Sequence, residues 1–204
     1  MPALVRPVVD DRDALLAFLD QQRQAIRLAT HGLSDGDARV APGPGPLALG
    51  GLVKHLTAVE RSWTGTLLER PPPRKGDRKQ LFRMSPDETL SGLLDEYRQA
   101  AAATGAAIAA EPDLDRAVPA PRVSWLPDGV EEWSVRWVVL HLITETARHA
   151  GHADRVREAI DGATAMPLMA AAEGWPAGAG VRPWAPPTGG DGARVGRGRG
   201  GVPT

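Results

Sequence analysis

The chain has 204 residues, 42% of them hydrophobic, which is enough for one domain with a sizeable core plus long loops or a tail. Its net charge of −1 gives no whole-chain field that would attract nucleic acid or an anionic membrane. The absence of cysteine excludes disulfides, a protein thiolate nucleophile and metal sites with cysteine ligands.

No targeting or membrane segment is predicted. The N-terminal residues lack the long apolar run of a secretion signal, and no later stretch is apolar over the thickness of a bilayer. We therefore expect a cytoplasmic protein with neither a membrane nor a nucleic acid as its partner. Any metal ion must be held by histidine and carboxylate side chains, together with water.

Two amphipathic helices are predicted in the first half of the chain, at residues 11–30 and 49–69. Each carries apolar side chains at spacings of three and four, which places them on one face of a helix. A connection rich in Gly and Pro, residues 33–48, separates the two helices. The second helix ends at the Pro-rich run 70–79, because proline cannot continue a helix.

A third helix is predicted from a capping pattern. Ser85 can be the N-cap, Pro86 the first helical residue and Glu88 the capping-box residue, so we expect the helix to begin at Pro86 and to reach Ala110. A second long connection, residues 111–132, follows it.

A fourth helix can be capped by Ser134, and it is expected to run to Ile160 and to end at Gly162. Residues from Ala177 onward are mostly Gly, Pro and Arg and have little to bury, so we expect them to be disordered. The chain thus divides into a helical domain, residues 1–176, and a tail, residues 177–204.

The predicted fold class is an all-α four-helix bundle. Four helices are expected, with no strand and no internal repeat, and their apolar stripes would be buried against one another. We expect the connections 33–48 and 111–132 to line the mouth of any site on the bundle. Trp63 and Trp137 are interpreted as core residues rather than as a surface for a ligand.

Three histidines and a carboxylate share one stripe of the fourth predicted helix. At about 100° per residue, Glu145, His149 and His152 all lie within roughly 80° of His141, beside the apolar face. Glu145 and His149 are four residues apart, a spacing that suits one metal ion. An ordinary lattice of ion pairs between Glu145 and nearby arginines is the alternative, and the sequence leaves both open.

His55 adds a histidine from the second predicted helix. It lies near the apolar side, beside Leu56, where burying an unpaired imidazole would cost about 1–3 kcal/mol. A metal ion or a hydrogen-bond partner would offset this cost. One ligand from this helix and two from the fourth would leave coordination positions open, which is typical of catalytic sites. No role is assigned to His31.

The segments GGLVKHLTAVERSW and SVRWVVLHLITETARHAGHADRVREAIDG resemble the DinB-like superfamily over roughly residues 8–165. They are most similar to a branch from mycothiol-producing bacteria. The resemblance implies an up-up-down-down four-helix bundle. It also implies a divalent metal held by one helix-two histidine and by a pair of residues four apart on the last helix.

Carried over by position, the resemblance assigns the metal ligands to His55, Glu145 and His149. A Glu–His pair is similar to that of mycothiol-dependent maleylpyruvate isomerase. His152 stands where many members have a glutamine, so it is a candidate for contacting a ligand residue or the substrate. His141 and Arg148 are further candidates for these roles.

The resemblance implies an S-transferase or isomerase in which Zn²⁺ or Ni²⁺ activates mycothiol as a cosubstrate for reaction with an electrophile. The lack of cysteine fits this chemistry, because the sulfur would come from the cosubstrate. Two alternatives stay open: a non-catalytic stress-response bundle that binds a metal or a small molecule, and a hydrolase whose nucleophile is water. Relatives are often dimers, so a homodimer is also left open.

Overall fold

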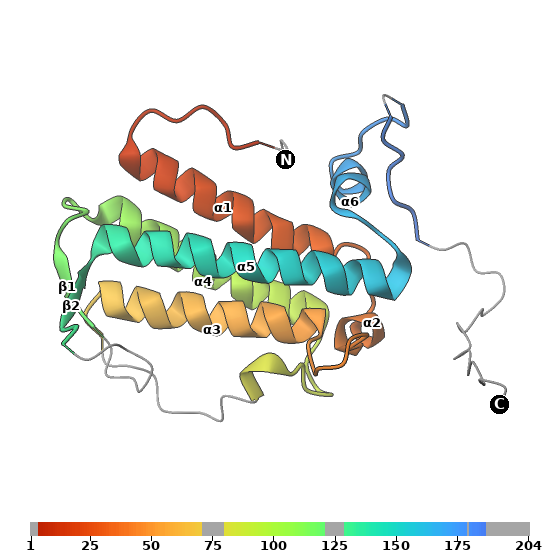
Figure 1. The fold of residues 1–204 in the computed structure, drawn as a ribbon, viewed down its shortest axis with the longest axis horizontal. Helices are drawn as coiled ribbons and strands as arrows, with labels where there is room; N and C mark the ends of the chain where they lie inside the picture. Colours follow the sequence, from red (N-terminus) through yellow and green to blue (C-terminus); the bar gives the residue numbers. More distant parts are fainter. Residues whose placement is uncertain (1–3, 71–79, 121–128, 179, 187–204) are drawn as a thin grey trace, which may run out of the picture.

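Four long helices form a bundle in the computed structural model, which describes residues 4–70, 80–120, 129–178 and 180–186 (Figure 1). Their N-cap residues are Asp10, Ala48, Thr89 and Ser134, and all of these except Ala48 accept a hydrogen bond from the first turn through their side chain. The predicted all-α four-helix bundle is therefore confirmed. The four helices are α1 (Asp11–Ala29), α3 (Leu49–Leu67), α4 (Leu90–Ala110) and α5 (Val135–Asp161).

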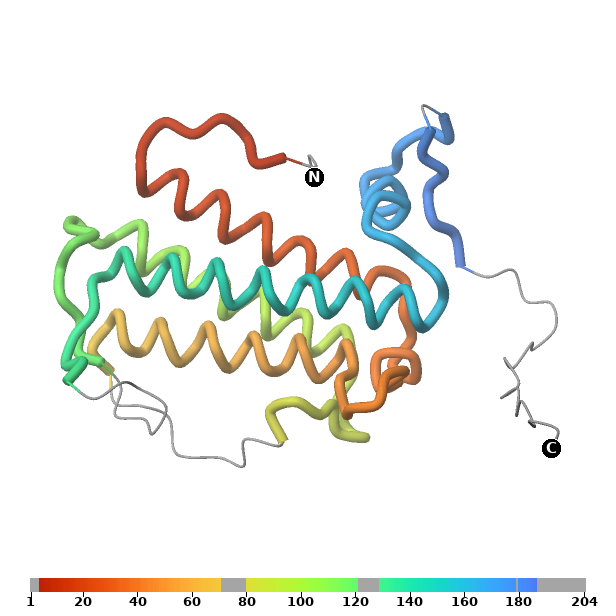
Figure 2. Tube along the Cα trace, viewed as in Figure 1, coloured from red at the N-terminus to blue at the C-terminus, as the bar shows by residue number. Residues whose placement is uncertain are grey.

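The helix directions differ from the expected order. α1 and α5 run one way along the bundle, and α3 and α4 run the other way (Figure 2). In chain order the helices are thus up, down, down and up, so the expected up-up-down-down order is wrong. The reason is that α3 ends at one end of the bundle and α4 begins at the other, whereas α2 (Asp35–Arg39) and the turn around it bring the chain back at the same end.

The start of α4 also differs from the prediction. α4 begins at Leu90, so the predicted start at Pro86 is wrong. Ser85 and Glu88 do form the expected contact, in which the Ser85 amide donates to the Glu88 carboxylate at 2.6 Å, but this contact closes a turn. Arg39 donates to the Glu88 carbonyl at 2.5 Å, so a tertiary contact takes an acceptor that a longer helix would need.

Short elements join the helices. The expectation of no strand is wrong, because β1 (Ala117–Pro119) and β2 (Glu132–Ser134) pair as antiparallel strands at the end of the bundle (Figure 1). β2 leads directly into α5, whose Ser134 cap and left-handed Gly162 terminus were both predicted. Most of the Pro-rich run 70–79, and residues 121–128 of the second connection, lie outside the described residues.

The segment that follows α5 packs back against the bundle. After α6 (Ala165–Ala172), the Trp184 ring lies 4.8 Å from the buried Arg157 guanidinium, and its amide donates to the Pro167 carbonyl. Gly32, with φ of 71°, leaves room for this ring, because a Cβ there would lie 2.4 Å from it. Residues 187–204 lie outside the described part, so the division of the chain at residue 177 stays a prediction.

A charged network is buried among the helices. Arg23 on α1 donates to both oxygens of Glu60 on α3, at 2.7 and 2.9 Å. Thr104 on α4 also donates to Glu60, at 2.5 Å, and shares a hydrogen bond with Thr64. The network therefore ties α1, α3 and α4 together with both charges compensated.

No helix in the described part of the chain is both long and apolar enough to cross a bilayer.

Removing the Glu60 charge should destabilise the fold strongly. Glu60→Gln leaves the Arg23 guanidinium buried without a counter-charge, so we expect a loss of about 3–5 kcal/mol in the free energy of unfolding, measured by urea denaturation. The matched control is Glu96→Gln, which breaks the Arg61–Glu96 pair, where both side chains are 52% exposed. The control should change stability by at most about 1 kcal/mol. Equal small losses in both variants would show that the buried pair does not hold the bundle.

Two glycines of α3 should respond to alanine in opposite ways. A Cβ on Gly51 would lie 2.1 Å from the Phe82 carbonyl oxygen, where the turn η1 (Gln80–Phe82) crosses the helix, so Gly51→Ala should destabilise by about 1–3 kcal/mol. A Cβ on Gly65 meets nothing within 4 Å, so Gly65→Ala should stabilise by about 0.5–1 kcal/mol. Thermal unfolding of both variants measures the difference. A raised midpoint for Gly51→Ala would mean that η1 does not rest on α3.

Candidate metal centre

Three side chains from α3 and α5 meet on one face of the bundle. His55 lies in the second turn of α3, and Glu145 and His149 lie one turn apart in the middle of the antiparallel α5. Glu145 Oε1 is 3.2 Å from His149 Nε2 and 3.4 Å from His55 Nε2. The three potential ligand atoms all lie within 4.8 Å of one another. The structure thus brings together the three residues that the sequence proposed as ligands.

These distances fit a single divalent cation. Bonds of about 2.0–2.1 Å at tetrahedral angles hold two ligand atoms about 3.4 Å apart, close to the separations between Glu145 and the two imidazoles. Two imidazole nitrogens and a carboxylate oxygen form a donor set that suits Zn²⁺ and Ni²⁺. Two of the three separations therefore match such an ion, and the third, which is within 4.8 Å, requires the side chains to close around it.

The carboxylate of the cluster is ionised. Hydrogen bonds with His149 and His55 hold the pKa of Glu145 well below its usual range, and partial burial opposes this effect only in part. His149 Nδ1 is buried and has no hydrogen-bond partner within the described ranges, so the ring is oriented through Nε2. Glu145 consequently supplies a fixed negative charge between two imidazoles.

Phe82 stacks on the His55 ring. The two rings are stacked, with centroids 4.1 Å apart and planes at 20°, and His149 meets His55 edge-on at 4.8 Å. The sequence does not predict Phe82 at this site, because Phe82 lies in a connection without helical periodicity. Its position follows only from the crossing of η1 over α3. The connections expected to line the site were 33–48 and 111–132, whereas η1 is the segment that touches it. The expectation for those two connections stays a prediction.

Glu145 does not form the ordinary ion pairs with nearby arginines that the sequence left open as an alternative. Arg155 pairs with Glu158, and Arg157 pairs with Asp161 at 2.9 Å. The ion-pair partners of Glu145 in the described part of the chain are the two imidazoles. The stripe on α5 is therefore organised around histidine.

His152 and Arg148 flank His149 in the sequence of α5. Both are exposed, and the His152 ring centroid is 5.8 Å from that of His149. Neither residue contributes to the group of converging ligand atoms. Their proposed roles towards a ligand residue or a substrate stay predictions.

His141 belongs to an aromatic stack instead of the ligand group. Its ring is parallel to that of Trp137 at 5.1 Å, and Trp137 is parallel to Trp133 at 4.1 Å. Trp63 is buried, as predicted, but Trp137 is 36% exposed, so its interpretation as a core residue is wrong. Burial lowers the pKa of His141, which keeps the ring neutral at neutral pH.

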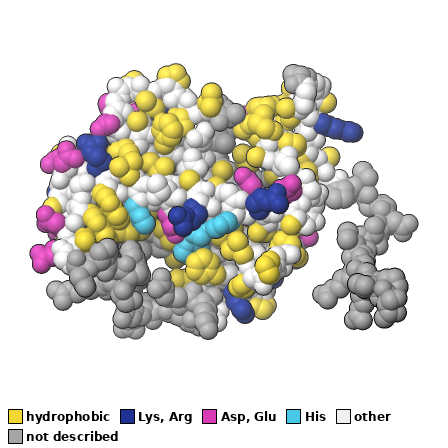
Figure 3. Space-filling view, in the orientation of Figure 1, with side chains coloured by type: hydrophobic (Ala, Val, Ile, Leu, Met, Phe, Trp, Pro, Cys, Tyr) yellow, Lys and Arg dark blue, Asp and Glu magenta, His cyan; other side chains and the backbone are white. Residues whose placement is uncertain are grey.

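The face that carries these groups is shown in Figure 3, where histidine side chains (cyan) appear between hydrophobic side chains (yellow) and charged ones. Trp133 was not predicted to be part of this face. A signal was present, since Trp133, Trp137, His141, Glu145 and His149 follow one another at a constant spacing of four.

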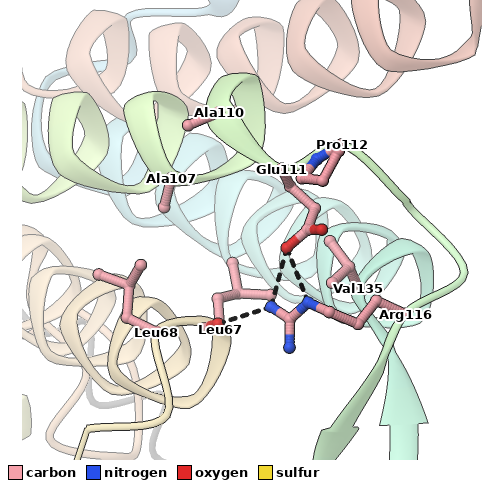
Figure 4. A pocket seen from close by; sticks show the side chains of 8 residues that line it. All are labelled: Leu67, Leu68, Ala107, Ala110, Glu111, Pro112, Arg116 and Val135. Atoms are coloured by element: carbon pink, nitrogen blue, oxygen red, sulfur yellow. Dashed lines mark hydrogen bonds and ion pairs between the residues drawn. The ribbon is translucent and has the colours of Figure 1, made fainter.

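A separate pocket lies at the end of the bundle near β1 and shares no residue with the metal cluster (Figure 4). Its one cation, Arg116, is paired with Glu111 at 2.8 Å and donates to the Leu67 carbonyl at 2.9 Å. No functional role is assigned to this pocket, since its charged groups are already paired. The pocket is lined by Leu67, Leu68, Ala107, Ala110, Glu111, Pro112, Arg116 and Val135.

Comparisons with known proteins agree with this architecture. A solved structure, described as a conserved protein from Enterococcus faecalis, is similar in fold, with a TM-score of 0.56 and 13% sequence identity. The match covers 76% of this chain and 100% of that chain. No curated protein sequence gives a significant match.

The family comparison is more specific. The sequence model of the mycothiol S-transferase family, a DinB-like family, matches residues 14–162, a range that contains all four long helices except the first residues of α1. Both the helix carrying His55 and the helix carrying Glu145 and His149 lie inside the match. The chain therefore belongs to the mycothiol S-transferase family.

Proposed function

We propose that the protein is a divalent-metal-dependent S-transferase that uses mycothiol as its thiol cosubstrate. The observation that carries this proposal is the convergence of His55, Glu145 and His149, whose ligand atoms lie within 4.8 Å of one another, in a chain of the mycothiol S-transferase family. The same three residues would serve an isomerase that uses mycothiol as a cofactor, so the thiol is the common element.

A bound divalent cation would supply a positive charge that lowers the pKa of a thiol and favours its thiolate. The chain's part is to set the charge of the site. One ionised carboxylate and two neutral imidazoles leave a divalent site with a net charge of +1, which an anionic sulfur neutralises. Three protein ligands also leave room for a ligand from solution.

The transfer reaction needs no nucleophile from the protein. The thiol proton goes to solvent, the sulfur forms a bond to an electrophilic carbon, and the leaving group departs with the electron pair of the broken bond. The chain has no cysteine, so the sulfur must come from the cosubstrate. His152 and Arg148 are exposed, and we propose that they contact polar groups of that cosubstrate.

A non-catalytic bundle is the second candidate. The contacts of Glu145 with His55 and His149 have the lengths of hydrogen bonds, so they could hold the helices together in a protein that only binds a small molecule. Metal content and thiol turnover separate the two candidates.

Metal binding should depend on His55 and not on histidine in general. We expect close to one metal ion per chain in protein purified without an affinity tag, and a loss in affinity of at least about tenfold in His55→Ala, because one of the three ligands is removed. His31→Ala, which removes a histidine far from the cluster, is the control and should keep its metal. Elemental analysis and competition with a chelator provide the measurement.

The result that would contradict the proposal is a wild-type protein that holds no metal as purified and none after addition of Zn²⁺ or Ni²⁺. The three residues would then form a hydrogen-bonded cluster, and the non-catalytic candidate would be favoured.

Turnover should consume mycothiol. With an alkyl halide as electrophile, we expect loss of free thiol with release of halide, and a decrease in kcat/KM of at least about 10- to 100-fold in His149→Ala. His31→Ala should retain the wild-type rate. Product formed at the same rate without thiol would identify a hydrolase. Metal-loaded protein without turnover for a range of thiols and electrophiles would identify a binding protein.

A further inference from the structure

The aromatic stack of Trp133, Trp137 and His141 presents ring edges to solvent. Neighbouring rings in the stack are parallel to within 4°, and Trp137 has a ring against each of its faces, at 4.1 and 5.1 Å. Trp137 is nevertheless 36% exposed, so its accessible surface lies along the ring edge.

Trp63 closes the other side of the stack. Its ring is tilted against all three others, with centroids 5.5 Å from Trp133, 5.8 Å from Trp137 and 4.8 Å from His141. Trp63 itself is buried in the core. The stack is therefore anchored from the inside, and its outer edges form a fixed aromatic surface.

This surface runs directly into the metal cluster. Trp137, His141, Glu145 and His149 are spaced by four on α5, so they follow one stripe of the helix. Each step of four residues advances about 6 Å along the helix axis. Measured along the helix axis, His141 and Trp137 therefore lie about 6 and 12 Å from Glu145, within the length of a molecule of one or two fused rings.

We propose that the stack of Trp133, Trp137 and His141 binds a flat aromatic group of the electrophilic substrate and directs its reactive carbon towards His55, Glu145 and His149. Ring edges carry partial positive charge and ring faces carry partial negative charge, so the edges of the stack complement the face of a flat, electron-rich aromatic ligand. The proposal rests on the proposed S-transferase function and names the substrate class for the same site.

The sugar part of a thiol cosubstrate fits this surface less well. A sugar ring packs its C–H groups against an open face of an aromatic side chain, and both faces of Trp137 are already covered. A flat aromatic ligand brings its own π-face and needs only edges from the protein. The observed stack therefore favours an aromatic electrophile.

The test compares two alkyl bromides of similar reactivity, 2-(bromomethyl)naphthalene and allyl bromide, with mycothiol as the thiol. Trp137→Leu should raise KM for the naphthyl substrate by roughly 2- to 12-fold, the contribution of an aromatic contact. It should lower kcat/KM for allyl bromide, which has no aromatic group, by a clearly smaller factor than for the naphthyl substrate, and the metal content should stay at the wild-type level. Trp137→Phe keeps a smaller aromatic ring and should give an intermediate KM. Because this variant retains an aromatic side chain in the stack, it should fold even when Trp137→Leu does not.

The matched control is Trp175→Leu, because Trp175 lies after α6 and its indole donates to Glu173, outside the stack. This variant should change neither substrate. Binding is measured separately by calorimetry with unreactive 2-naphthylmethanol, for which Trp137→Leu should weaken the Kd by the same factor. This measurement needs no turnover, so it decides the proposal even when the S-transferase function fails.

Two results would overturn the proposal. An unchanged Kd for 2-naphthylmethanol in Trp137→Leu would show that the stack does not bind aromatic groups. Equal losses in kcat/KM for the naphthyl and allyl substrates would show that Trp137 acts only on the structure of the bundle.

Discussion

The antiparallel packing of α3 against α5 is the constraint on which both the group of candidate ligands and the aromatic stack depend. At one end of this contact Trp63 meets the aromatic stack, and one to two turns further on His55 meets Glu145 at 3.4 Å. A slip of one helical turn would move the facing side chains by about 5.4 Å, more than the distance between these two atoms. The register of the two helices therefore fixes the ligand group and the aromatic surface together.

Glu60 and Glu145 differ in burial, and this difference decides which of the two carboxylates can bind a ligand from solution. Glu60 is fully enclosed, and its oxygens are satisfied by Arg23 and Thr104, so it has no capacity left for a ligand. Glu145 is only partly buried, and its contacts are two imidazole nitrogens that can instead coordinate an ion. The first carboxylate stabilises the fold through compensated charge, and the second is open to exchange with solution.

The stripe on α5 combines two kinds of chemistry at one spacing. Its first turns carry Trp137 and His141, whose neutral rings make an apolar surface, and its middle carries Glu145 and His149, whose donor atoms suit a cation. The polar half lies within the range that matches the mycothiol S-transferase family, and it is where we propose that the metal ion binds. The aromatic half is the part that we propose holds an electrophile beside the cluster.

The sequence by itself determined the four long helices, the ends of α5 and the candidate ligands, because helical periodicity, caps and the four-residue spacing are local properties of the chain. Only the tertiary structure decided the start of α4, where Arg39 takes the Glu88 carbonyl, and the helix order, which follows from the path of the connections. It also decided that Phe82 lies on His55 and that Trp137 exposes an edge, because both depend on contacts between segments far apart in the chain. A pattern in one helix specifies which side chains share a face, whereas the partner of that face is fixed by packing.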